Sequence, residues 1–226
     1  MNRALVVAAH PDDEVLGCGG TIAKMADEGW HVHVLILAEG VTSRSRKRLR
    51  KRSDLSALAK SAKAAATILG VQSVELQSFA DNRMDGVELL DVVKVVEEKV
   101  AKVEPRRVLT HHGGDVNVDH QVVHEAVLAA VRPLPGSSIA ELLFFEVPSS
   151  TEWRPGVSLP PFAPALFVDI SGTFDRKLRA LEAYASELRA FPHPRSLRAV
   201  EHLARWRGAT AGVEAAEAFE VGRILV

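Results

Sequence analysis

The stretch Ala4-Leu5-Val6-Val7-Ala8-Ala9-His10-Pro11-Asp12-Asp13-Glu14 joins an apolar run of strand length to a histidine and three acids. Buried charges and imidazoles are costly unless they are paired or bind a metal. In an open α/β sheet, ligands bind at the carboxyl ends of the strands. The stretch therefore predicts a strand over 4–9 that is followed directly by part of a functional site.

Strand and helix patterns alternate through the next 140 residues, which is typical of parallel strands joined by right-handed helical crossovers. We therefore predict a Rossmann-like α/β fold, a three-layer sandwich with a mostly parallel sheet. The hydrophobic spacing predicts further strands at 31–38, 74–79, 108–110 and 142–147, and helices at 15–28, 53–69, 90–103 and 119–131.

The C-terminal part of the chain has a different composition. Residues 148–163 are rich in proline and serine, which predicts a loop. The prolines at 192 and 194 end a helix expected over 174–188. We expect 148–226 to form an extension packed on the Rossmann-like core, so that 1–226 make a single domain. The remaining predicted elements are a strand at 165–170, a helix at 196–208 and a strand at 217–225.

Composition excludes some classes of protein. The net charge of −1 over 226 residues argues against a nucleic-acid binder, which would carry a basic excess. Cys18 is the single cysteine, so no intrachain disulfide can form, and a reducing, cytoplasmic compartment is expected. We expect neither a signal peptide nor a transmembrane segment.

A second polar cluster follows the predicted fourth strand and runs from His111 to His124. The carboxyl ends of parallel strands share one edge, so this cluster can meet the first one. Two histidines and one carboxylate are typical of hydrolytic zinc sites and of non-haem iron sites. His10 and Asp13 are close enough to bind one ion. The spacing does not choose between His120 and His124, which lie one helical turn apart.

A carboxylate beside such an ion can accept the proton of the metal-activated water. Asp12 and Glu14 are both candidates for this base. The plainer interpretation of the first cluster is a helix start, with Asp12 or Asp13 as the N-cap and Glu14 complementing the helix dipole. The second histidine-rich cluster at a matching strand end favours the metal site. Asp115 and Asn117, which follow two glycines, are equally good turn residues.

These residues resemble the PIG-L/LmbE-like zinc-dependent N-acetylglucosaminyl deacetylases. The similarity lies in AHPDDE at 9–14, GCGGT at 17–21 and NVDH at 117–120. Similar stretches at 39–42, 81–85 and 216–219 extend the resemblance over nearly the whole chain. The resemblance implies hydrolysis of the N-acetyl group of an amino sugar or its conjugate, including phosphate- or nucleotide-linked ones. The products would be acetate and a free amine.

The resemblance also implies roles for single residues. His10, Asp13 and His120 would bind one zinc ion, which selects His120 as the third ligand. Asp12 would be the general base that acts on the zinc-bound water. Asp119 would orient a neighbouring group without binding the ion.

Asn117 departs from the family pattern, because many members carry a histidine there, three residues before the last ligand. An asparagine amide can donate a hydrogen bond to an oxyanion but cannot deliver a proton. The general acid therefore stays open between protonated Asp12 and a nearby histidine. The histidine candidates are His111, His112, His124 and His193.

Basic residues outside the clusters suggest an anionic substrate. The run from Arg44 to Arg52 has seven basic residues in nine, and it either faces solvent or steers an anionic substrate. Arg83 either pairs with neighbouring acids or clamps a sugar hydroxyl or phosphate. We assign Arg83 and Glu14 to substrate binding. The expected partner is thus a small N-acetyl amino sugar, and a homo-oligomer is compatible with the sequence.

Two alternative functions use the same residues. A two-His, one-carboxylate iron(II) oxygenase would consume oxygen and release no acetate. A non-catalytic sugar- or nucleotide-binding module would keep the fold and bind ligand without product. The acid next to a metal ligand weighs against such a module, because mere binding needs no spare carboxylate.

Overall fold

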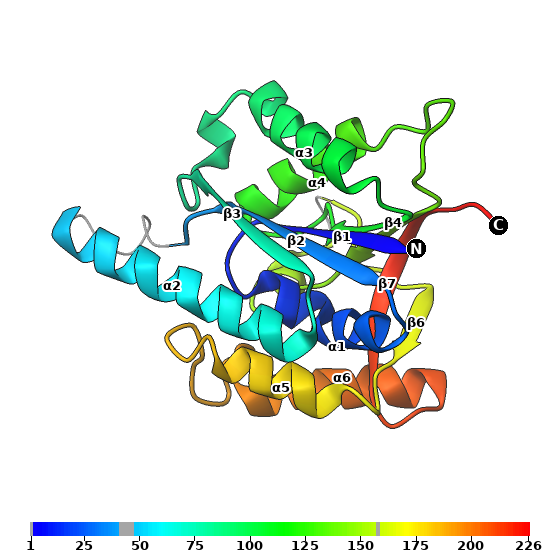
Figure 1. The fold of residues 1–226 in the computed structure, drawn as a ribbon. Helices are drawn as coiled ribbons and strands as arrows, with labels where there is room; N and C mark the ends of the chain where they lie inside the picture. The colour runs from blue at the N-terminus through cyan, green and yellow to red at the C-terminus, as the bar shows by residue number, and fades with distance from the viewer. Residues whose placement is uncertain (1, 41–47, 157–158) are drawn as a thin grey trace.

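The computed structural model describes residues 2–40, 48–156 and 159–226, with side chains from 55 onward in the second range. Its centre is a seven-stranded sheet in the order β3-β2-β1-β4-β5-β7-β6 (Figure 1). The strands are β1 (Arg3–Ala8), β2 (His31–Ala38), β3 (Ser73–Phe79), β4 (Arg107–His111), β5 (Glu141–Phe145), β6 (Leu166–Asp169) and β7 (Ala216–Ile224).

The sheet is mostly parallel. Strands β1 to β5 pair in parallel, whereas β7 runs antiparallel to both β5 and β6. Helices cover both of its faces, so the predicted three-layer Rossmann-like α/β fold is confirmed (Figure 1). On one face lie α3 (Leu89–Val103) and α4 (Val118–Ala130); on the other lie α1 (Asp13–Asp27), α2 (Arg48–Leu69), α5 (Phe174–Glu182) and α6 (Leu197–Ala211).

The central strands are buried on both faces, as expected for a sheet covered by helices on each side. Along β1, Val6 packs into the core beneath α1, and its neighbour Leu5 packs into the core beneath α3 and α4. This double burial explains why the strands are continuous apolar runs in the sequence.

The order of the strands reverses between β1 and β4. From β1 the chain adds β2 and β3 on one side, and from β4 it adds β5 on the other. The connections therefore leave in opposite directions and open a crevice at the carboxyl ends of β1 and β4. Both polar clusters of the sequence follow these two strand ends.

Several elements differ from the sequence prediction. α5 ends at Glu182 rather than near 188, because the chain then turns and buries Tyr184. Leu90, which shares the apolar spacing of α3, is 62% exposed. α2 begins at Arg48, five residues earlier than predicted. Of the basic run, residues 44–47 lie outside the described residues, and 48–52 form the start of α2.

Helix α1 is interrupted at Cys18, whose φ of −146° and ψ of 25° are not helical. Glu217 of β7 accepts the backbone N–H of Gly20 at 2.9 Å. Lys177 of α5 donates to the carbonyl of Leu16 at 2.9 Å and pairs with Glu217. These contacts satisfy backbone groups that the break leaves without helical partners. C-terminal elements thus hold the first turn of α1 in place.

No helix in the described part of the chain is long and apolar enough to cross a membrane.

The packing of α1 generates a stability prediction. A Cβ added to Gly20 would lie 2.7 Å from Cδ1 of Ile170 and 2.8 Å from two more of its carbons. We expect Gly20→Ala to lower the free energy of unfolding in urea by about 1–2 kcal/mol, since overpacking outweighs the gain in helix propensity. Gly172→Ala is the control, because an added Cβ there meets nothing within 4 Å. Equal stability of both variants would contradict this account.

Candidate metal centre

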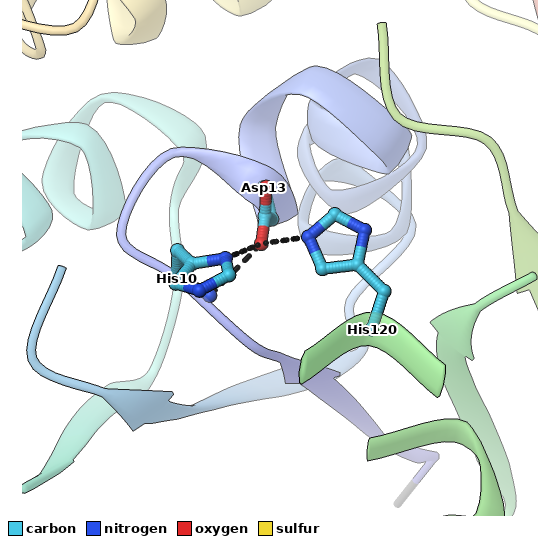
Figure 2. Close-up of side chains that lie close together, drawn as sticks. All are labelled: His10, Asp13 and His120. Carbon is cyan, nitrogen blue, oxygen red and sulfur yellow. Dashed lines mark hydrogen bonds and ion pairs between the residues drawn. The ribbon is translucent and has the colours of Figure 1, made fainter. Parts of the chain in front are cut away.

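His10, Asp13 and His120 meet in the crevice between β1 and β4 (Figure 2). His10 follows β1, Asp13 opens α1, and His120 lies in the first turn of α4. Oδ2 of Asp13 is 3.2 Å from Nδ1 of His10 and 3.1 Å from Nε2 of His120. All three side chains are buried, and one candidate ligand atom from each lies within 4.8 Å of the others. We call these residues the trio.

Two atoms of the trio lack the partners that buried polar atoms normally have. Within the described residues, Oδ1 of Asp13 and Nε2 of His120 are buried without a hydrogen-bond partner. Nε2 of His120 meets Oδ2 of Asp13 as an ion pair at 3.1 Å. Two imidazole nitrogens and a carboxylate that converge in this way are a suitable ligand set for a divalent metal ion. The trio could thus hold such an ion.

The charges of the trio strongly perturb one another. Burial lowers the pKa of His120, but the charge of Asp13 and a hydrogen bond with Asp115 raise it to about 9. Burial raises the pKa of Asp13, but His120 and His10 hold it well below its usual range. Asp13 therefore stays ionised between two imidazoles. A metal ion would displace the imidazole protons, because a histidine ligand must be neutral.

A carboxylate stands behind each histidine of the trio. Nε2 of His10 is 3.0 Å from Oδ2 of Asp119, and Nδ1 of His120 is 3.1 Å from Oδ2 of Asp115. Such a carboxylate fixes the ring orientation and the tautomer of a metal-binding histidine. Asp119 also accepts the backbone N–H of Met84 at 2.9 Å, which fixes the carboxylate itself.

Asp115 is a residue whose importance the sequence did not reveal. It is fully buried and accepts hydrogen bonds from the hydroxyls of Ser150 and Thr151, the latter at 2.7 Å. Burial raises the pKa of Asp115, but the hydrogen bond and the charge of His120 act in the opposite direction, and the pKa falls to about 2. Asp115 is therefore more than the turn residue that its local sequence suggests. Its partners come from a loop 35 residues away, so no local signal could have identified the role.

A second group of possible ligands lies on the other side of His10. Asp81 is 3.3 Å from Nε2 of His10, and with Asp119 these residues could also surround an ion. Both carboxylates already accept N–H donors from Asn82, at 2.8 Å for Asp81 and 2.7 Å for Asp119. Because N–H donors already occupy oxygens of both carboxylates, this group is a weaker candidate for a metal site than the trio.

Asp12 lies beside the trio and has an oxygen that the protein does not use. Its Oδ2 is 3.3 Å from Nη1 of Arg195, whereas Oδ1 is buried and has no hydrogen-bond partner among the described residues. Burial raises the pKa of Asp12 to about 8, although the charge of Arg195 opposes this shift. Its φ of 108° is unusual for a residue other than glycine, and such strain often marks functional sites.

Glu14 supports Asp12 from behind. One of its oxygens accepts the backbone N–H of Asp12 at 3.1 Å, and the other accepts the hydroxyl of Tyr184 at 2.6 Å. Burial raises the pKa of Glu14 to about 7, and the bond with Tyr184 opposes the shift. Both oxygens are thus held inside the protein. This position does not support the substrate-binding role predicted for Glu14, and it leaves Asp12 as the better-placed base.

A small cavity of about 40 Å³ opens beside His10 and Asp12. Asn117 lines it as the N-cap of α4, and its Oδ1 accepts the backbone N–H of Asp119 at 2.9 Å. This bond orients the amide nitrogen, which contacts Oδ1 of Asn82 at 3.3 Å. Asn117 therefore presents an N–H donor and no proton-transfer group.

Arg195 also lines the cavity. Arg83 lies elsewhere: it is exposed and precedes the short helix η1 (Met84–Gly86), while its neighbour Asn82 lines the cavity. Arg83 comes near the site because it follows the cavity residue Asn82 in the sequence. The sequence could not place Arg195, which is 183 residues from Asp12.

The four histidines considered as general acids do not line this cavity in the described structure. Nε2 of His111 accepts the backbone N–H of Ala9 at 2.8 Å, and burial holds the pKa of His111 well below its usual value. His124 contacts the carbonyl of His111 at 2.9 Å and faces a different cavity. His112 pairs with Glu220 there, and His193 accepts the backbone N–H of Arg195. The structure thus brings His120, and not His124, to the other candidate ligands.

Comparison with known proteins gives a family match. The model of the PIG-L family, described as GlcNAc-PI de-N-acetylase, matches residues 5–131. The matched region includes the trio, Asp12, Asp115 and Asn117.

Individual relatives extend the match over most of the chain. The "Uncharacterized deacetylase YaiS" of Escherichia coli K12 is 29% identical over 188 residues, which cover 80% of this chain and 90% of the relative. The "Probable N-acetyl-alpha-D-glucosaminyl L-malate deacetylase 2" of Bacillus cereus is 28% identical over 194 residues, 83% of this chain and 84% of its own. The crystal structure of a 4-carboxy-2-hydroxymuconate hydratase from Pseudomonas putida KT2440 superposes with a TM-score of 0.81 and 25% identity, covering 100% of this chain and 98% of that one.

The trio generates a prediction for metal content. We expect His120→Ala to lose most of the bound divalent metal, because the remaining two ligands cannot complete the site. His124→Ala is the matched control, since this histidine lies one turn further along α4 and lines a different cavity. Elemental analysis after dialysis measures both variants. Full metal content in His120→Ala, or its loss in His124→Ala, would refute the assignment.

The carboxylate behind His120 generates a second prediction. We expect Asp115→Asn to weaken metal affinity about 10- to 100-fold, because the amide no longer fixes the ring as a carboxylate does. Competition with a chromophoric chelator gives the affinity. Asp91→Asn, an exposed acid in α3, should leave it unchanged. An affinity that is equal in the two variants would show that Asp115 does not support the metal.

Proposed function

The chain belongs to the PIG-L family of de-N-acetylases, and from this premise we propose that it is a zinc-dependent N-deacetylase of an amino sugar or its conjugate. The observation that carries the proposal is the convergence of His10, Asp13 and His120 beside Asp12, whose Oδ1 has no hydrogen-bond partner among the described residues. Hydrolysis of an amide needs both a Lewis acid and a base, and this arrangement supplies places for both.

Zinc suits the trio, because two histidines and one carboxylate leave open coordination positions, as in hydrolytic zinc enzymes. When bound, the ion would lower the pKa of a coordinated water towards neutrality and polarise the carbonyl of the substrate. Asp119 and Asp115 would keep the two histidine rings in the orientation that presents a lone pair to the ion.

Asp12 is proposed as the base that takes the proton of the attacking water. Arg195 and the support of Glu14 fix its carboxylate and its backbone next to the trio. Burial raises the pKa of Asp12 to about 8 although the charge of Arg195 opposes this shift, and a cation bound beside it would lower the pKa towards the ionised form that a base needs. Asp12 sits in the cavity wall, where a substrate amide would arrive.

Asn117 is proposed to donate its amide N–H to the oxyanion that forms when water attacks the carbonyl. The leaving amine also needs a proton, and none of the four candidate histidines lines the described cavity. We therefore assign the return of this proton to Asp12, which holds it after the first step. One carboxylate would then serve as base and as acid in turn.

The substrate class is proposed from the family and from charge. The family description and the Bacillus cereus relative both name N-acetylglucosaminyl conjugates, and the malate conjugate of the latter is anionic. An anionic conjugate would suit Arg83, the exposed neighbour of the cavity residue Asn82, whose role in binding stays a prediction. We further propose that the enzyme acts on such a small molecule without a nucleic-acid partner.

A second candidate reaction follows from the hydratase, whose structure superposes on this chain with a TM-score of 0.81. Addition of water to an unsaturated carboxylate would also use an activated water and a base. The two reactions differ in product, because hydration releases no acetate. A screen of N-acetylated amino sugars and of unsaturated dicarboxylates, with and without a chelator, separates them. Oxygen uptake in the same screen would indicate the iron(II) oxygenase instead.

The proposed base generates a test. We expect Asp12→Asn to keep its zinc but to lose at least about 100-fold in kcat, because an amide cannot accept the proton. Acetate release from N-acetylglucosamine conjugates measures the rate, and elemental analysis measures the zinc. Asp85→Asn, an exposed acid in η1, is the control and should keep full activity. Activity in Asp12→Asn close to that of the parent enzyme would eliminate this role.

A further inference from the structure

Trp153 is an exposed tryptophan on a loop that also supports the metal centre. It ends the short helix η2 (Thr151–Trp153) and is 53% exposed. Its ring meets that of His193 nearly at right angles, with 5.9 Å between the ring centres. Trp153 thus offers a half-exposed aromatic face that is paired with a second ring.

The loop that carries Trp153 is firmly attached to the metal centre. The hydroxyls of Ser150 and Thr151 donate to Asp115, the carboxylate behind His120. The side chain of Glu152 closes the loop by accepting the backbone N–H of Ser149 at 2.7 Å. These contacts leave little freedom to the backbone next to Trp153. The ring is therefore presented at a fixed place relative to the trio.

His193 is held in a similar way by the second loop. Its Nδ1 accepts the backbone N–H of Arg195 at 3.0 Å. The side chain of Arg195 then joins the two loops, because its Nε donates to Oγ of Ser149 at 2.7 Å and its Nη1 reaches Asp12. Both aromatic rings are thus connected through short chains of contacts to residues that line the cavity.

We propose that Trp153 and His193 form a binding subsite for a second sugar ring, the one attached to the N-acetylated ring in the cavity. This inference rests on the proposed function. The apolar face of a pyranose can stack on an aromatic ring while its hydroxyls remain in water, which suits a ring that is half exposed. A subsite outside the small cavity would let the enzyme select conjugates over free N-acetylglucosamine.

The test compares two substrates in two tryptophan variants. The substrates are N-acetylglucosamine and N,N′-diacetylchitobiose, which has one more sugar ring. Trp153→Ala should raise KM for the disaccharide about five- to tenfold while kcat stays within about twofold. For the monosaccharide both constants should stay as in the parent. Trp153→Tyr, which keeps a stacking surface, should restore most of the affinity.

Trp206→Ala is the matched control, because this tryptophan is 67% exposed but lies on α6. It should leave both substrates unaffected. The proposal is overturned if Trp153→Ala affects the two substrates equally, or if it behaves like Trp206→Ala. A change in molar mass of Trp153→Ala in light scattering would also overturn it, by placing the ring in an interface between copies of the chain.

Binding measurements separate this proposal from the proposed function. Calorimetric titration of the zinc-loaded protein with N,N′-diacetylchitobiose does not depend on turnover. If the parent protein binds the disaccharide, Trp153→Ala binds it at least about fivefold more weakly, and no acetate is released, the subsite stands and the deacetylase assignment fails. If acetate is released but the titrations of parent and variant agree, the subsite fails alone.

Discussion

The buried carboxylate of Asp13 is the charge on which the arrangement of the site depends. It is fully buried, and an ionised group in such a place must be compensated. The compensation comes from imidazoles on opposite sides, His10 after β1 and His120 in α4. Because these histidines follow strands on either side of the switch point, Asp13 ties the two halves of the parallel sheet together at their carboxyl edge. A metal ion bound by the trio would serve the same electrostatic purpose.

The C-terminal third of the chain contributes to the site, although all three residues of the trio lie in the first 120 residues. Tyr184 holds Glu14, Arg195 reaches Asp12, and Glu217 with Lys177 caps the broken helix α1. These contacts all lie at the acidic turn or in the N-terminal half of α1. The C-terminal part of the chain therefore supports the turn that carries Asp12 and Asp13. It is joined to the central sheet by the pairing of β7 with β5. This explains how Asp12 can keep a left-handed backbone conformation next to the trio.

Asn117 shows how one position can combine two tasks. Its carbonyl oxygen caps α4, and its amide nitrogen donates to Oδ1 of Asn82, which also lines the cavity. A histidine in its place could carry a proton, whereas the asparagine can only donate a hydrogen bond. The proton transfer that the family resemblance leads one to expect from a histidine at this position would then need another group. Asp12 lines the cavity, and its Oδ1 has no hydrogen-bond partner within the described part of the chain, so it is our candidate for that group.

The sequence by itself determined the alternation of strands and helices and the two polar clusters, because hydrophobic period and strand ends are local properties. It also brought His10 and Asp13 together, since three residues in one turn cannot separate far. The spacing alone left His120 and His124 open, and the tertiary structure places His120 beside Asp13. Only the tertiary structure revealed that Arg195 reaches Asp12 across 183 residues. Such contacts depend on the directions in which side chains leave packed elements. Periodicity does not encode those directions, so the fold could be predicted while the supports of its site could not.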